Sequence, residues 1–205
     1  MSINSYRHRI HKAEQPGSPL LFVFHGTGGD ENQFFDFGRR LLPDATIVSP
    51  RGDVSEHGAS RFFRRTGEGV YDMDDLAART GTMAQYIRAH KDSAKPATVI
   101  GLGYSNGTNI LASVMLSQPE LFDAAILMHP LIPWKPAAQT GLAGKHVLIT
   151  AGQRDPICPP ELTQSFADYL ISQEVETDLF WHPGGHEIQQ GEVTAIENFV
   201  RKNAR

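Results

Sequence analysis

The sequence predicts an α/β fold with a mostly parallel central sheet. Short runs of apolar and β-branched residues recur along the chain, and stretches of helical length with an apolar stripe lie between them. The apolar runs are continuous rather than alternating, which is typical of strands that helices cover on both faces. Because strand and helix alternate in this order, we expect right-handed crossovers between parallel strands.

We expect a sheet of about seven strands, flanked by helices. Residues 6–13 are predicted to form an N-terminal edge strand, which ends before a turn at residues 15–19. Buried strands are expected at residues 20–24, 45–49, 97–101, 124–128, 146–150 and 177–181. Amphipathic helices are expected at residues 72–94, 107–117, 159–173 and 187–201.

Length and composition restrict the function classes. The chain has 205 residues, of which 40% are hydrophobic and 20% charged, and this predicts one globular domain spanning residues 1–205. The 19 basic and 23 acidic residues give a net charge of -4 with no long basic run, so we do not expect nucleic acid as a partner.

Cysteine content and hydropathy bear on location. The chain has 1 cysteine, Cys158, so no intramolecular disulfide is possible and a cytoplasmic location is favoured. The N-terminus lacks the apolar region of a signal peptide. The longest apolar runs, residues 20–24 and 124–128, are far shorter than the roughly 20 residues that a membrane helix needs, so no membrane span is expected.

The most informative motif connects an expected strand to an expected helix. Residues 103–107 read Gly-Tyr-Ser-Asn-Gly, a G-x-S-x-G sequence. A sharp turn here strains the backbone of Ser105, and Gly103 and Gly107 leave room for it. The helix that follows directs its free N–H groups at a developing oxyanion. We therefore predict that Ser105 is a nucleophile; the alternative is a plain turn with a capping serine.

A serine nucleophile requires a base, and the base requires a group that orients it. Asp155 follows the strand at 146–150, and His186 follows the next strand, so both are expected at the carboxyl edge of the sheet. The order Ser105, Asp155, His186 suits a catalytic triad on such a sheet. The alternative for Asp155, which precedes a proline, is a turn or a helix cap.

His182 competes with His186 for the role of the base. The two glycines before His186 favour it, because they allow a loop that returns the imidazole over the sheet edge. The two histidines also have the spacing of a helical metal pair. Pro-Gly-Gly between them excludes that helix, so no metal site is predicted.

A glycine-rich segment, His25-Gly-Thr-Gly-Gly-Asp30, follows the strand at 20–24. We expect the backbone N–H of Thr27 here, together with that of Asn106, to form an oxyanion hole. His25 is a further candidate for contact with substrate. The glycine spacing fits neither a dinucleotide fingerprint nor a P-loop, so phosphate binding is not expected.

Four motifs in this order resemble those of the phospholipase/carboxylesterase family of α/β-hydrolases, which includes the acyl-protein thioesterases. They are HGTGGDE at 25–31, GYSNG at 103–107, GQRDP at 152–156 and GHE at 185–187. The resemblance implies an α/β-hydrolase fold without a large cap domain and frequent homodimers. It also implies Ser105 as nucleophile, Asp155 as acid and His186 as base.

Within that family the chain is more similar to bacterial carboxylesterases than to thioesterases. SPRG at 49–52 and RFFRR at 61–65 carry this similarity. A Trp-Tyr-Asp segment usual in the thioesterases is missing, and Asn106 stands where they usually have Gln. These departures speak against long-chain acyl and phospholipid substrates.

The connection after residue 52 holds further candidates for the pocket. Phe62 and Phe63 either wall an acyl or aromatic pocket or belong to the core. Arg61, Arg64 and Arg65 either bind a substrate carboxylate or form a solvated charge cluster.

The leading hypothesis is a serine carboxylesterase that cleaves small or medium acyl or aromatic esters through an acyl-enzyme. The alternatives are a thioesterase or lysophospholipase, and a catalytically silent hydrolase fold that serves as a binding module. We expect a small-molecule ester as partner, no cofactor and no metal ion. Cys158 lacks a glycine elbow and is expected to be a buried small residue rather than a nucleophile.

Overall fold

A computed structural model describes residues 2–204 and is built around a seven-stranded sheet with the strand order β1-β3-β2-β8-β9-β10-β11. Its strands are β1 (His8–His11), β2 (Leu20–Phe24), β3 (Thr46–Pro50), β8 (Val99–Tyr104), β9 (Ala124–Met128), β10 (His146–Gly152) and β11 (Glu176–His182). Only β1 runs antiparallel to its neighbour in this sheet. The predicted α/β fold with a mostly parallel sheet is confirmed.

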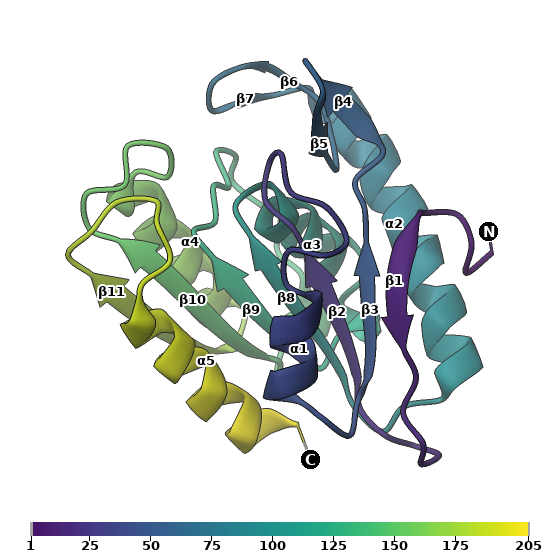
Figure 1. The fold of residues 1–205 in the computed structure, drawn as a ribbon. Coiled ribbons are helices and arrows are strands. Elements are labelled where there is room, and N and C mark those ends of the chain that lie inside the picture. The colour runs from purple at the N-terminus through teal and green to yellow at the C-terminus, as the bar shows by residue number, and fades with distance from the viewer. Residues whose placement is uncertain (1, 205) are drawn as a thin grey trace.

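Helices cover both faces of the sheet (Figure 1). In the described residues they are α1 (Phe35–Leu41), α2 (Met73–Ala94), α3 (Asn106–Ser117), α4 (Pro160–Ser172) and α5 (Gln190–Asn203), with short 3-10 turns at Pro119–Leu121 and Thr140–Leu142. The sequence predicted α2 to α5 within a few residues. It did not predict α1, which spans 7 residues and has no side-chain cap at its N-terminus.

The strands supply two cores because successive side chains point to opposite faces. Phe22 and Phe24 of β2 pack on the side of α2, α3 and α4, whereas Leu21 and Val23 pack on the side of α1 and α5. Every residue of β2 is 0% exposed. The continuous apolar runs in the sequence reflect this burial on both faces.

Two small hairpins lie above the carboxyl ends of the parallel strands (Figure 1). They are formed by β4 (Val54–Glu56) with β5 (Ala59–Arg61), and by β6 (Arg65–Gly67) with β7 (Val70–Tyr71). The sequence predicted this part only as a long connection. No larger cap covers the sheet edge in residues 2–204, as expected.

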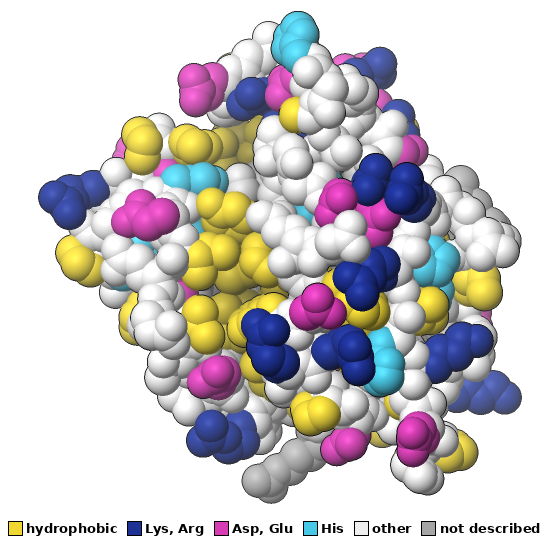
Figure 2. Space-filling view, in the orientation of Figure 1, with side chains coloured by type: hydrophobic (Ala, Val, Ile, Leu, Met, Phe, Trp, Pro, Cys, Tyr) yellow, Lys and Arg dark blue, Asp and Glu magenta, His cyan; other side chains and the backbone are white. Residues whose placement is uncertain are grey.

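One face of the molecule is hollowed between α1 and α5, and apolar side chains gather there (Figure 2). Phe37 and Leu41 of α1 and Val193 and Val200 of α5 line this groove. Within the described residues, no helix is both long enough and apolar enough to span a bilayer.

Candidate active site

Ser105 lies in a strained turn between β8 and α3. Its φ of 52° and ψ of -118° are unusual for a residue with a side chain. The turn depends on close backbone approach at both flanking glycines. A Cβ on Gly107 would lie 2.4 Å from the carbonyl oxygen of His25, and one on Gly103 would lie 2.7 Å from the backbone nitrogen of Thr108. The G-x-S-x-G sequence therefore adopts the turn that its glycines predict.

The structure brings Ser105, His186 and Asp155 together. His186 Nε2 lies 2.9 Å from Ser105 Oγ, and His186 Nδ1 lies 2.7 Å from Asp155 Oδ2. The three residues follow β8, β11 and β10, so they meet where the strands end at one edge of the sheet. Tyr104 donates its hydroxyl to the carbonyl oxygen of His186 at 2.7 Å and thereby holds the histidine loop over the serine.

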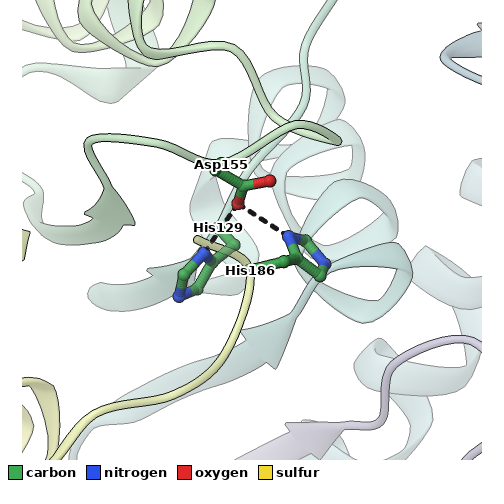
Figure 3. A group of neighbouring side chains, drawn as sticks. All are labelled: His129, Asp155 and His186. Atoms are coloured by element: carbon green, nitrogen blue, oxygen red, sulfur yellow. Dashed lines mark hydrogen bonds and ion pairs between the residues drawn. The ribbon is translucent and has the colours of Figure 1, made fainter. Parts of the chain in front are cut away.

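Asp155 is buried and accepts hydrogen bonds on both carboxylate oxygens. Its Oδ1 accepts from the backbone N–H groups of Ile157 at 2.8 Å and Cys158 at 2.9 Å. Its Oδ2 faces two histidines, His186 and His129 (Figure 3). Burial raises the pKa of Asp155, but the hydrogen bonds from the two histidines and the backbone outweigh it, so the pKa lies well below its ordinary value.

His129 is a member of this site that sequence reasoning missed. It follows β9 with a φ of 52°, and its side chain is 0% exposed. Its Nδ1 lies 2.9 Å from Asp155 Oδ2, and its Nε2 lies 3.0 Å from Glu192 Oε1. Burial lowers the pKa of His129, but hydrogen bonds to the two carboxylates outweigh it and raise the pKa to about 9.

Glu192 extends the buried chain of polar groups into α5. Its side chain is 0% exposed, and its Oε2 accepts from the backbone N–H of Gln189 at 2.7 Å. The same oxygen lies 3.3 Å from His182 Nε2, while His182 Nδ1 accepts from the backbone N–H of Gly184 at 3.1 Å. His182, the alternative base in the sequence, thus faces Glu192 and not Ser105.

The two expected oxyanion donors lie beside Ser105. Thr27 and Asn106 line the same cleft as the serine, and in residues 2–204 neither backbone N–H has a protein acceptor. Their side chains are held: Thr27 Oγ1 accepts from Arg61 Nη1 at 2.7 Å, and Asn106 Oδ1 accepts from the backbone N–H of Phe62 at 2.7 Å.

The cleft has a volume of about 310 Å³, and it is walled by the hairpins and by the segments that follow β2, β8, β9, β10 and β11. The side chains of Tyr71, Leu131 and Ile157 line it with Ser105 and His186. Its size is at the lower end of the range for ligand sites, roughly 300–1,000 Å³.

Three predicted pocket residues do not reach the cleft. His25 and Phe62 are 1% exposed and Phe63 is 0% exposed, and none of the three lines it. His25 Nε2 accepts from the backbone N–H of Gly52 at 2.9 Å, so its proton lies on Nδ1, which faces the carbonyl oxygen of Gly26 at 2.7 Å. His25 thus joins the glycine-rich loop to the loop after β3, and the two phenylalanines belong to the core.

The arginine cluster is largely held in ion pairs. Arg65 lies 2.8 Å and Arg61 3.6 Å from Glu56, and both line the cleft. Arg64 is directed away from the cleft, 3.5 Å from Asp72 and 3.3 Å from Asp75.

Cys158 is buried, as expected, and burial raises the pKa of its thiol. Its Sγ lies 3.2 Å from the carbonyl oxygen of His129.

Two trios of side chains have donor atoms within 4.8 Å of one another, which is close enough for a metal ion. They are His129, Asp155 and His186, and His129, His182 and Glu192. In both trios histidine nitrogens face carboxylate oxygens at 2.7–3.3 Å. A metal ion at either place would have to displace these hydrogen-bonded protons, and the expectation that none is needed stays a prediction.

Comparisons with known proteins identify the family of this chain. The model of the dienelactone hydrolase family matches residues 62–190. MhqD of Bacillus subtilis strain 168 is 38% identical over 185 residues, which cover 89% of this chain and 92% of MhqD. Atu2452 of Agrobacterium tumefaciens strain C58, a solved protein of unknown function, is 56% identical with a TM-score of 0.94 over 99% of both chains.

A solved carboxylesterase of Bacillus cereus is 32% identical with a TM-score of 0.89, over 97% of this chain and 95% of that one. The expected resemblance to bacterial carboxylesterases with an α/β-hydrolase fold is thereby confirmed. The chain belongs to the dienelactone hydrolase family and is a hydrolase of the dienelactone hydrolase and carboxylesterase type.

Proposed function

We propose that the protein is a serine esterase in which Ser105 is the nucleophile, His186 the general base and Asp155 the group that orients the base. The observation that carries this proposal is the hydrogen-bonded series from Ser105 Oγ through His186 to Asp155, at 2.9 Å and 2.7 Å. A serine hydroxyl is a weak nucleophile until a base removes its proton, and an imidazole needs a fixed tautomer to do so. The carboxylate on Nδ1 fixes that tautomer.

The reaction proceeds in two halves. Ser105 Oγ attacks the ester carbonyl carbon as its proton moves to His186 Nε2, and the N–H groups of Thr27 and Asn106 bind the oxyanion. His186 then gives the proton to the departing alkoxide, which leaves as an alcohol, while the acyl group stays on Ser105 as an ester. Water attacks the acyl-serine while His186 takes its proton, and collapse of the second oxyanion returns that proton to Ser105 and releases the acid.

The cleft favours small or medium acyl or aromatic esters. A volume of about 310 Å³ leaves little room for a long acyl chain. The solved carboxylesterase that is 32% identical supports ester chemistry. His186 and Asp155 act in this mechanism as triad residues and not as metal ligands, and the single buried cysteine suits a cytoplasmic location.

The test compares hydrolysis of p-nitrophenyl esters from acetate to decanoate by wild type and Ser105→Ala. We expect activity on the short esters and a loss of at least ~10⁴-fold in kcat in the variant, because the members of a triad act as a unit. Ser165→Ala, an exposed serine on α4, is the matched control and should retain the wild-type rate. Substantial ester hydrolysis by Ser105→Ala would refute the mechanism.

Measuring acyl-CoA and lysolipid beside these esters separates the alternatives. Faster cleavage of acyl-CoA or lysolipid than of short esters would indicate a thioesterase or lysophospholipase. No turnover of any ester by folded wild type would favour the binding module.

A further inference from the structure

The polar chain that begins at Ser105 does not end at Asp155. Asp155 Oδ2 faces His129 Nδ1 at 2.9 Å, and His129 Nε2 faces Glu192 Oε1 at 3.0 Å. The side chains of Asp155, His129 and Glu192 are each 0% exposed. These three ionisable groups are in direct contact and removed from water. Two carboxylates placed so close together therefore need a positive charge between them.

The geometry around His129 identifies that arrangement. Both of its nitrogens are within hydrogen-bond distance of a carboxylate oxygen. A neutral imidazole has only one N–H, so one nitrogen lone pair would face a carboxylate in the protein interior. An imidazolium donates to both carboxylates and leaves the buried group with one net negative charge.

The other titratable groups around His129 do not supply the positive charge that the two carboxylates need. The rings of Tyr104, His182 and His186 lie 5.7, 5.4 and 5.1 Å from it, and Cys158 Sγ contacts its carbonyl oxygen. His182 accepts a backbone N–H on Nδ1, which assigns its single proton to Nε2. His129 is therefore the group that compensates the second carboxylate.

We propose that His129 is a buried imidazolium which, together with Glu192, positions Asp155 and thereby orients His186. His129 and Glu192 are thus positioning residues, because neither lines the cleft. The positioning role rests on the proposed esterase function, whereas the charge of His129 does not.

The arrangement has a consequence for the pH dependence of the reaction. Asp155, His129 and Glu192 together present one net negative charge behind His186, which stabilises the positive charge that His186 acquires in the transition state. Glu192→Gln keeps the shape of the side chain and, as long as His129 keeps its proton beside Asp155, removes this net charge. The variant should lose rate, and the acid limb of its kcat/KM profile should move to lower pH.

The charge of His129 is tested by ¹⁵N NMR of the wild-type protein with labelled histidine, at pH 7.5. His129→Gln, or failing that a second variant at the same position such as His129→Asn, assigns the signal by its loss. We expect one imidazole with both nitrogens protonated at a pH where an ordinary histidine is neutral. A His129 signal with one deprotonated nitrogen at this pH would overturn the proposal, whether or not the protein hydrolyses esters.

The positioning role is tested by the pH profile of ester hydrolysis for Glu192→Gln and Glu197→Gln. Glu197 is an exposed residue of the same helix, so it is the matched control. We expect about a tenfold loss of kcat/KM and a shift of the acid limb by about one pH unit to lower pH in Glu192→Gln, with little change in KM. The control should match wild type.

A kcat/KM of Glu192→Gln that matches wild type across the whole pH profile would overturn the positioning role. If Glu192→Gln does not fold, the double variant His129→Gln/Glu192→Gln serves in its place. It keeps one net negative charge on Asp155, so its acid limb should stay near that of wild type while kcat falls. A large shift of the acid limb in the double variant would also contradict the proposal.

Discussion

The hydrogen bonds from the proposed imidazolium of His129 to two buried carboxylates make the stability of the protein fall as the pH rises into the alkaline range. The pKa of His129 is raised from 6.5 to about 9 in the folded protein, so the folded state retains a proton that the unfolded state loses. The resulting stabilisation is fully present below about pH 6.5 and disappears as the pH rises through about 9. With about 1.4 kcal/mol for each unit of pKa, it amounts to about 3 kcal/mol.

Urea unfolding between pH 6 and pH 9.5 measures this effect. The reference is His129→Gln/Glu192→Gln, which carries the same net charge at the site but has no imidazolium. We expect the unfolding free energy of wild type to fall by about 3 kcal/mol more than that of the reference over this range. Groups that titrate elsewhere contribute equally to both proteins and cancel. Equal pH slopes in the two proteins would refute the reasoning.

Three further substitutions test the site. Gly107→Ala should unfold the protein or destabilise it by several kcal/mol, because a Cβ would lie 2.4 Å from a backbone carbonyl oxygen; Gly81→Ala in α2, with open space around it, should leave the melting temperature unchanged or raised. Tyr104→Phe removes the hydrogen bond to the His186 carbonyl and should lower kcat about fivefold with KM unchanged, so an unaltered kcat would contradict the role assigned to this hydroxyl. Cys158→Ser should keep the esterase rate within about threefold, since burial raises the pKa of the thiol and makes it a poor nucleophile; a hundredfold loss would point to cysteine chemistry.

The strands and longer helices were predictable because their signals are local and strong. β2 and β9 are continuous apolar runs, and α2 has an apolar stripe along 22 residues. The end of β8 was less predictable: the expected strand ended at residue 101, yet pairing with β2 and β9 extends the strand to Tyr104. The β4 to β7 hairpins were missed, because strands of two or three residues carry no periodicity.

The candidate site also contains residues that the sequence predicts and residues that it does not. Ser105, Asp155 and His186 could be placed from the glycine turn and from their positions after strands. His129 also follows a strand, but no motif surrounds it, and its two carboxylate partners come from distant segments. Glu192 forms a capping box with Gln189 at the start of α5, and nothing in the sequence indicates its contact with His129.

The pocket residues were the weakest prediction because burial depends on tertiary packing. Phe62 and Phe63 lie near the cleft in sequence, but their side chains turn into the core behind it. The residues that line the cleft instead include Tyr71 and Leu131, which the sequence did not single out.

The measurement that tests the central claim most directly is labelling with a fluorophosphonate probe, followed by mass spectrometry of the labelled peptide. The probe reacts with an activated serine and not with an ordinary hydroxyl. We predict that wild type is labelled at Ser105, and that Ser105→Ala and His186→Ala are not labelled although both remain folded. Folded wild type without label, or label on another residue, would contradict the account of Ser105 as the nucleophile.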